Sequence, residues 1–132
     1  MLGTSPPASR LQFYLCQFLI LLAFPLSSQS HPLSKQECSE GADYIQRAAN
    51  FRDHGVSEAR FIGIFDKDVQ ESQATPPEQR WFMQDEEDRV FLRTAVVGVF
   101  KRPKQPALHK EEFYKACKIR SAASSSETGL FM

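Results

Sequence analysis

The sequence predicts an all-α fold, a small up-down bundle of helices closed by one disulfide bond. Apolar side chains recur at intervals of three and four residues along most of the chain after residue 34, which is typical of amphipathic helices. Helix start signals precede these segments, and one cysteine lies in the first segment and another in the last. The chain has 132 residues, enough for one small domain and too few for two.

Residues 1–30 have the pattern of a secretory signal peptide. Arg10 supplies a positive charge, an apolar run over 11–24 follows, and small residues come next. The run is shorter than the roughly 20 apolar residues that a membrane-spanning helix needs. We expect cleavage after Ser30 or after Ser28 and a periplasmic or secreted protein in a bacterium. The alternative is an uncleaved segment that anchors the protein in the membrane.

Two cysteines, Cys38 and Cys117, remain after such a cleavage, because Cys16 lies inside the apolar run. In an exported chain of this size, two cysteines usually pair. The bond would close a loop of about 80 residues, which corresponds in the chain-entropy treatment to roughly 4.5 kcal/mol of stabilisation. The sequence holds no Cys-x-x-Cys motif, so a structural disulfide is favoured over a reactive thiol or a metal ligand.

The first helix is expected over 35–54. Ser34 and Glu37 form a capping box at its start, and Gly55 suits the left-handed residue that follows a helix end. Small residues gather on this helix, where they would allow a neighbouring helix to pack closely: Gly41, Ala42, Ala48 and Ala49.

Two further helical segments follow. The second helix is expected to begin after its N-cap Ser57 and to reach Val69. A third pattern begins at the capping residue Thr75 and continues to Lys101. A single helix of that length would span about 38 Å, too long for so small a domain. We therefore expect a break near Gln84–Asp88, which makes the bundle one of four helices or five.

A final helix is expected over 107–120, so the predicted helical domain covers 31–120. In an up-down bundle, the start of the first helix and the end of the fourth lie at the same end, which would bring the two cysteines together. Residues 121–132 are rich in serine and lack apolar periodicity. We expect them to form a disordered tail.

Three short motifs carry a family resemblance. Phe51-Arg52-Asp53-His54-Gly55 ends the first predicted helix, Ser57 begins the second, and Tyr114-Lys115-Ala116-Cys117 closes the last. Together with the signal peptide, this combination resembles a group of small uncharacterised exported bacterial helical proteins, over most of 36–118. The resemblance implies export, helices and the disulfide, and no activity. The pair Trp81-Phe82 is not part of that pattern, and neither is the serine-rich C-terminus.

The composition and motifs exclude several function classes. Lys+Arg and Asp+Glu both number 16, so the chain lacks the basic excess of a nucleic-acid-binding protein and any general attraction to anionic membranes. No nucleophile motif occurs, and Asp66–Asp68 lacks the remaining positions of a calcium loop. His109 and Glu112 offer only two metal ligands, and we expect His109 at the surface. These patterns favour a protein that is not an enzyme and holds no cofactor.

His31 is the one unusual candidate for metal chemistry. If cleavage falls after Ser30, the new terminus presents an α-amine beside an imidazole, a chelate suited to Cu(II). Termini are usually mobile, so a metal site there is the less favoured interpretation.

A candidate partner surface comprises Trp81, Phe82 and Phe91. Three consecutive large apolar residues, Trp81 to Met83, cannot all face one core from a helix, so we expect at least one to be exposed or to cover the helix junction. The alternative is a local mini-core. The sequence thus predicts an exported protein with a binding or structural role and an unidentified protein partner. The alternatives are a periplasmic stress chaperone and a copper-binding protein.

Overall fold

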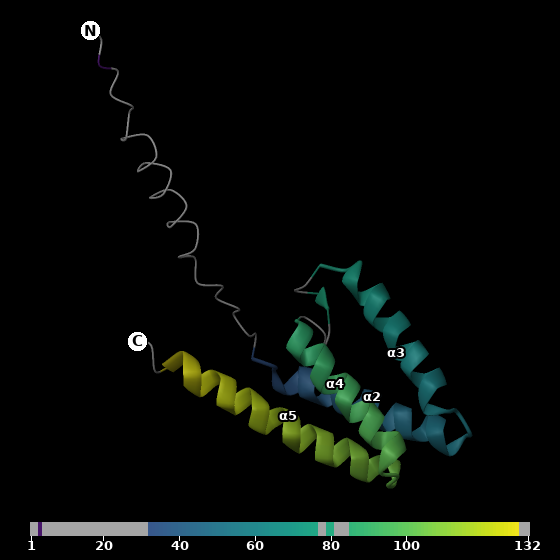
Figure 1. Cartoon of the computed structure of the whole chain (residues 1–132). Coiled ribbons are helices and arrows are strands. Elements are labelled where there is room, and N and C mark those ends of the chain that lie inside the picture. Colours follow the sequence, from purple (N-terminus) through teal and green to yellow (C-terminus); the bar gives the residue numbers. More distant parts are fainter. Residues whose placement is uncertain (1–2, 4–31, 77–78, 81–84, 130–132) are drawn as a thin grey trace.

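The computed structural model describes residues 32–76, 79–80 and 85–129, together with Gly3. Gly3 is the one described residue of the predicted signal peptide. His31, Trp81 and Phe82 lie outside the described residues. Within them the chain forms four α-helices and no strand (Figure 1): α2 (Lys35–Asp53), α3 (Glu58–Gln73), α4 (Glu86–Lys101) and α5 (Pro106–Gly129). The predicted all-α fold is confirmed. None of these helices combines the length and apolarity that crossing a membrane requires.

Successive helices run in opposite directions, as in the predicted up-down bundle. The beginning of α2 is joined to the middle of α5 by the bond between Cys38 and Cys117, while Arg52 at the end of α2 contacts His109 near the start of α5. Figure 1 shows α3 and α5 on opposite sides of α4, and α2 packs against all three. The helix α2 is therefore the central element of the bundle.

The predicted boundaries of α2 are confirmed by its caps. The hydroxyl of Ser34 accepts a hydrogen bond from the backbone N–H of Glu37 at 3.1 Å, and the Glu37 carboxylate accepts from the backbone N–H of Ser34 at 2.6 Å. At the other end Gly55 has φ of +86°, a conformation that glycine adopts without strain. Ser57 then caps α3 by accepting from the N–H of Arg60 at 3.3 Å.

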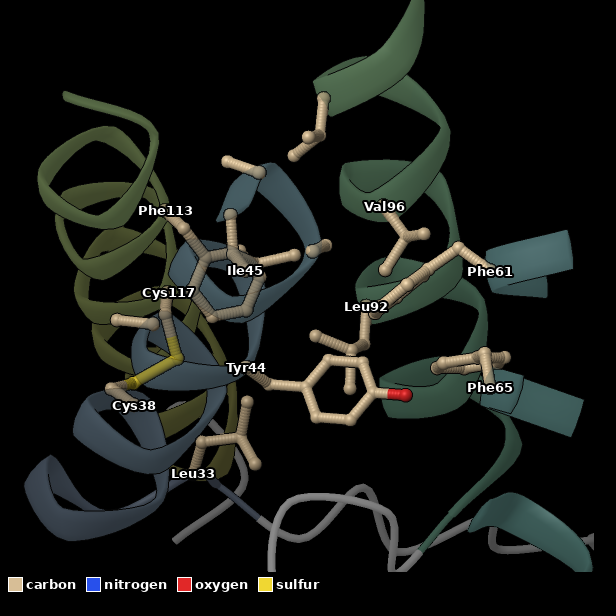
Figure 2. Close-up of a cluster of buried hydrophobic side chains, with 14 residues drawn as sticks. Leu33, Cys38, Tyr44, Ile45, Phe61, Phe65, Leu92, Val96, Phe113 and Cys117 are labelled. Atoms are coloured by element: carbon tan, nitrogen blue, oxygen red, sulfur yellow. A yellow bond between two sulfur atoms is a disulfide. The ribbon is translucent and has the colours of Figure 1, made fainter. Parts of the chain in front are cut away.

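The core has a close-packed side and an aromatic side. The small residues predicted to allow close packing, Gly41, Ala42, Ala48 and Ala49, are all buried. On the other side Tyr44 meets the rings of Phe61 and Phe65 edge to face, with centroid distances of 5.9 Å and 6.1 Å (Figure 2). Such edge-to-face pairs add stability beyond the area that they bury.

The disulfide joins the beginning of α2 to the middle of α5. Cys38 and Cys117 are bonded, with their Cα atoms 5.6 Å apart and 79 positions apart in sequence. Both are fully buried, and Figure 2 shows Leu33 near them. The predicted pairing is confirmed.

The end of α3 and the start of α4 both differ from the sequence-based prediction. The helix α3 continues to Gln73, beyond the predicted end at Val69. The expected break is present, but α4 begins after the N-cap Asp85 rather than after Thr75. The Asp85 carboxylate accepts from the backbone N–H of Asp88 at 2.9 Å, whereas the Thr75 signal is followed in the described residues only by a short turn at Gln79. Of the two helix counts expected, the described residues show four.

The last helix is longer than predicted. We expected residues 121–132 to be disordered, but α5 continues through Gly129. The serine hydroxyls do not disrupt this helix, because those of Ser124, Ser125 and Ser126 donate to carbonyls four residues earlier. Ser121 donates to the carbonyl of Leu33, which ties this turn of α5 to the segment before α2.

Candidate functional site

A groove of about 330 Å³ lies between α4 and α5. Its apolar lining comes from three helices: Phe91, Ala95 and Gly98 on α4, Phe113 and Ala116 on α5, and Ile45 on α2. Ala95, Gly98 and Ala116 carry a methyl group or no side chain, and they leave the space between α4 and α5 unfilled. The rings of Phe91 and Phe113, with centroids 5.1 Å apart, lie together at one end.

Charged side chains gather at the other end of the groove, where α4 ends and α5 begins. Arg102, Lys104, His109 and Glu112 line it there. Among them Arg102 folds back along α4, because a Cβ atom built on Gly98 would lie 3.7 Å from Nη2 of its guanidinium. The Arg102 side chain forms neither a hydrogen bond nor an ion pair with any residue that the structure describes. Its charge is thus held over the groove wall without a bonded partner from that part of the chain.

The second cation at this end is neutralised within the protein. Nζ of Lys104 donates to both carboxylate oxygens of Glu112, at 2.8 Å and 2.7 Å. This hydrogen bond lowers the pKa of the Glu112 carboxyl below its usual value, and the charges of Lys104 and Arg102 act in the same direction. Lys104 and Glu112 therefore contribute no net charge to the groove.

His109 is buried, with 8% of its surface exposed, where the sequence suggested a surface position. Its Nε2 accepts a hydrogen bond from the backbone N–H of Lys104 at 3.1 Å and lies 3.2 Å from Nη1 of Arg52. A ring nitrogen that accepts from a backbone N–H carries no proton, so the ring is neutral with its proton on Nδ1. Burial, and then the charges of Arg52 and Lys104, lower the pKa of His109 and keep it neutral.

Arg52 fixes this end of the groove. Nη1 donates to the carbonyl of Val99 at 2.7 Å and Nη2 donates to the carbonyl of Lys104 at 2.6 Å, while Asp53 pairs with the guanidinium at 2.8 Å. One side chain from α2 thus satisfies carbonyl groups at the end of α4 and in the following loop. The Arg-Asp-x-Gly motif of the sequence has a structural role here.

A second polar cluster lies beside the aromatic end of the groove. Asp88 is 1% exposed, and its Oδ1 accepts from Nη1 of Arg120 at 2.5 Å. Its Oδ2 has no hydrogen-bond partner in the described part of the chain. Burial raises the pKa of Asp88 to about 6, against the opposing effect of Arg120. The same guanidinium lies 5.0 Å from the ring centroid of Phe91, which lines the groove.

Of the three residues predicted as a partner surface, the structure describes one. Phe91 is half-buried and lies in the groove, between Arg120 and Phe113. Trp81 and Phe82 lie outside the described residues, and so does His31. Within the described ranges, no three His, Cys, Asp or Glu side chains cluster in a way that would hold a metal ion.

Comparison of the chain with protein-family models, with curated proteins and with solved structures found no match.

Proposed function

We propose that the protein is an exported helical binding protein without catalytic activity, and that its ligand site is the α4–α5 groove. The groove itself supports the proposal. It is apolar along its length and has fixed charged groups at one end, the combination that is common in small-molecule sites. Its volume of about 330 Å³ lies at the lower end of the range for such sites, about 300–1,000 Å³, so the ligand is small.

Export is supported by the covalent framework. A buried disulfide between the first and last described helices fits an oxidising compartment, since cytosolic thiols are kept reduced. The apolar run before residue 25 and the resemblance to small exported proteins favour the same address.

Binding is favoured over catalysis because the titratable groups of the groove are already engaged. Nε2 of His109 accepts from Lys104 and faces the Arg52 cation, so it is not available as a general base. The Glu112 carboxylate is held by Lys104 through both oxygens. Arg102 can hold an anion but cannot exchange protons near neutral pH.

The experiment is a titration of the isotope-labelled, oxidised protein with 1-octanol, followed by amide chemical shifts. We expect saturable shifts at groove residues such as Ala95, Gly98 and Ala116. Gly98→Leu should abolish them, because the added side chain occupies the groove. Gly63→Leu is the matched control: Gly63 is also helical, but it is exposed on α3 and a Cβ there meets nothing within 4 Å.

Shifts that do not saturate, or that survive Gly98→Leu unchanged, would contradict the proposal. Thermal melting of both glycine variants distinguishes a filled groove from an unfolded protein, because only a folded Gly98→Leu variant tests binding.

A further inference from the structure

We infer that the ligand of the α4–α5 groove is a medium-chain carboxylic acid, with its hydrocarbon chain along the apolar lining and its carboxylate on Arg102. This inference rests on the proposed function of the groove.

The lining favours an unsubstituted hydrocarbon chain. Among the described residues that line the groove, Thr94 carries the only polar side chain outside the charged end. Its hydroxyl donates to the carbonyl of Val90 at 2.7 Å, so its proton is already used within α4. A ligand with polar groups along its chain would lose their hydrogen bonds to water there, whereas methylene groups would gain from burial.

The head group is selected by Arg102. A guanidinium can hold a carboxylate through two parallel hydrogen bonds, and these charge-assisted bonds are stronger than neutral ones. The Arg102 guanidinium lies beside Gly98, on the groove wall, and has no hydrogen-bond or ion-pair partner among the described residues. The ring proton of His109 on Nδ1 is a further donor at the same end.

The charge balance favours a monoanion. Lys104 is paired with Glu112, and Arg52 is paired with Asp53. His109 is neutral because its Nε2 accepts from a backbone N–H. Arg102 is left as the one net positive charge among these groups. One carboxylate would match it, whereas a phosphate monoester with two charges would leave one negative charge without a counter-charge among these groups.

The length of the groove favours a medium chain. The Arg102 guanidinium lies beside Gly98, which is 7 positions after Phe91 on α4, a separation of about 10 Å along the helix axis. With carbon–carbon bonds of about 1.5 Å, an extended chain advances about 1.3 Å per carbon. About eight carbons therefore span the distance from the aromatic end to the guanidinium. The paired rings of Phe91 and Phe113 limit a longer chain.

The test is isothermal titration of the oxidised protein at neutral pH with four ligands that share one chain: octanoate, 1-octanol, octylammonium and octyl phosphate. We expect one site, with octanoate at least tenfold tighter than 1-octanol and octylammonium weaker than both. Within the series from hexanoate to octanoate, each added methylene should tighten binding about fourfold.

Two arginine variants assign the head group. Arg102→Gln should bring octanoate down to the affinity of 1-octanol and leave 1-octanol unchanged. The matched control is Arg93→Gln, because Arg93 lies on the same helix but faces Asp66 of α3 at 3.8 Å, outside the groove. That variant should bind octanoate as the unmodified protein does.

The failures of the two proposals are distinguishable. Equal affinity for octanoate and 1-octanol would overturn the carboxylate inference and leave the groove as a binding site. Tighter binding of octyl phosphate than of octanoate would overturn the monoanion argument. Equal loss in Arg93→Gln and Arg102→Gln would show that the general charge of α4 attracts the ligand and would overturn the role of Arg102. No saturable binding of any ligand would overturn the proposed function as well.

Discussion

Nη1 of Arg52 lies 3.2 Å from Nε2 of His109, so a permanent cation faces an imidazole across the junction of three helices. The arrangement is stable only while the imidazole is neutral, because a protonated ring would place two positive charges in contact. The backbone N–H of Lys104, which donates to the same nitrogen, imposes the same condition. The Arg52 side chain is 13% exposed, so little solvent screens the pair.

Replacement of Arg52 should destabilise the fold. Arg52→Gln removes the donors to the Val99 and Lys104 carbonyls, and we expect the free energy of unfolding to fall by about 2–4 kcal/mol. Urea unfolding measures the loss. Arg47→Gln is the control, because Arg47 lies on the same helix and its described contacts are with the Tyr44 and Phe51 rings. An effect of Arg52→Gln no larger than that of Arg47→Gln would refute the structural role of Arg52.

The stability of the protein should fall on mild acidification because of His109. Its pKa in the folded state is lowered from 6.5, so the unfolded chain binds a proton that the folded chain excludes. The stabilising contribution is therefore present above pH 6.5 and is lost as the pH falls through the folded-state pKa. His109→Gln should flatten this part of the pH dependence of the urea midpoint; an unchanged slope would contradict the buried neutral ring.

Asp88 should act in the opposite direction at lower pH. Its pKa is raised from 3.8 to about 6, so between these values the folded chain holds a proton that the unfolded chain releases. This contribution is fully present below pH 3.8 and is lost as the pH rises through about 6, and it amounts to about 3 kcal/mol at most. Asp88→Asn should remove it, as measured by unfolding between pH 4 and pH 7.

Arg120 provides an independent check of Asp88. Arg120→Met leaves a buried carboxylate without its cation, so we expect a loss of about 3 kcal/mol at pH 7. The loss should shrink at pH 5, where Asp88 can take up a proton instead. A loss of the same size at both pH values would mean that Asp88 does not titrate in this range.

The disulfide prediction is tested by mass and by stability together. The protein recovered outside the cytoplasm should have the intact mass of a chain that begins at His31 or Gln29. This mass should rise by two hydrogens when the disulfide is reduced. A reduced, full-length protein in the membrane fraction would contradict export. Substitution of Cys38 and Cys117 by serine should lower the free energy of unfolding by about 2–5 kcal/mol in denaturant titration.

Local signals in the sequence predict much of this fold. The capping box at Ser34, the glycine at position 55 and the small residues of α2 act within one or two turns of the chain, and the structure confirms them. The start of α4 was less well predicted, because Thr75 and Asp85 both carry capping side chains and sequence alone does not rank them. The length of α5 was underestimated, because serine is neutral in a helix and Ser121 finds its partner, Leu33, far away in sequence.

The groove could not be predicted from the sequence for a related reason. It is formed where side-chain volume is missing on two helices at once, at Ala95 and Gly98 on α4 and Ala116 on α5. Its charged end depends on contacts that span 47 to 57 positions, such as those of Arg52 with Val99 and His109. The burial of His109 follows from these contacts and not from its neighbours in the chain. Of the predicted partner surface, Phe91 lies in the described part of the chain, where it lines the groove.

The position of the disulfide also determines how the molecule transmits force. Because Cys38 and Cys117 enclose α3, α4 and most of α2, tension applied at the two ends of the chain passes through one covalent bond and bypasses the enclosed segment. Stretching the oxidised protein can extend only the residues outside this ring. Reduction would release the 79-position loop, which adds about 270 Å of contour length. In an oxidising compartment the groove between α4 and α5 is thus mechanically isolated from whatever is attached to either end.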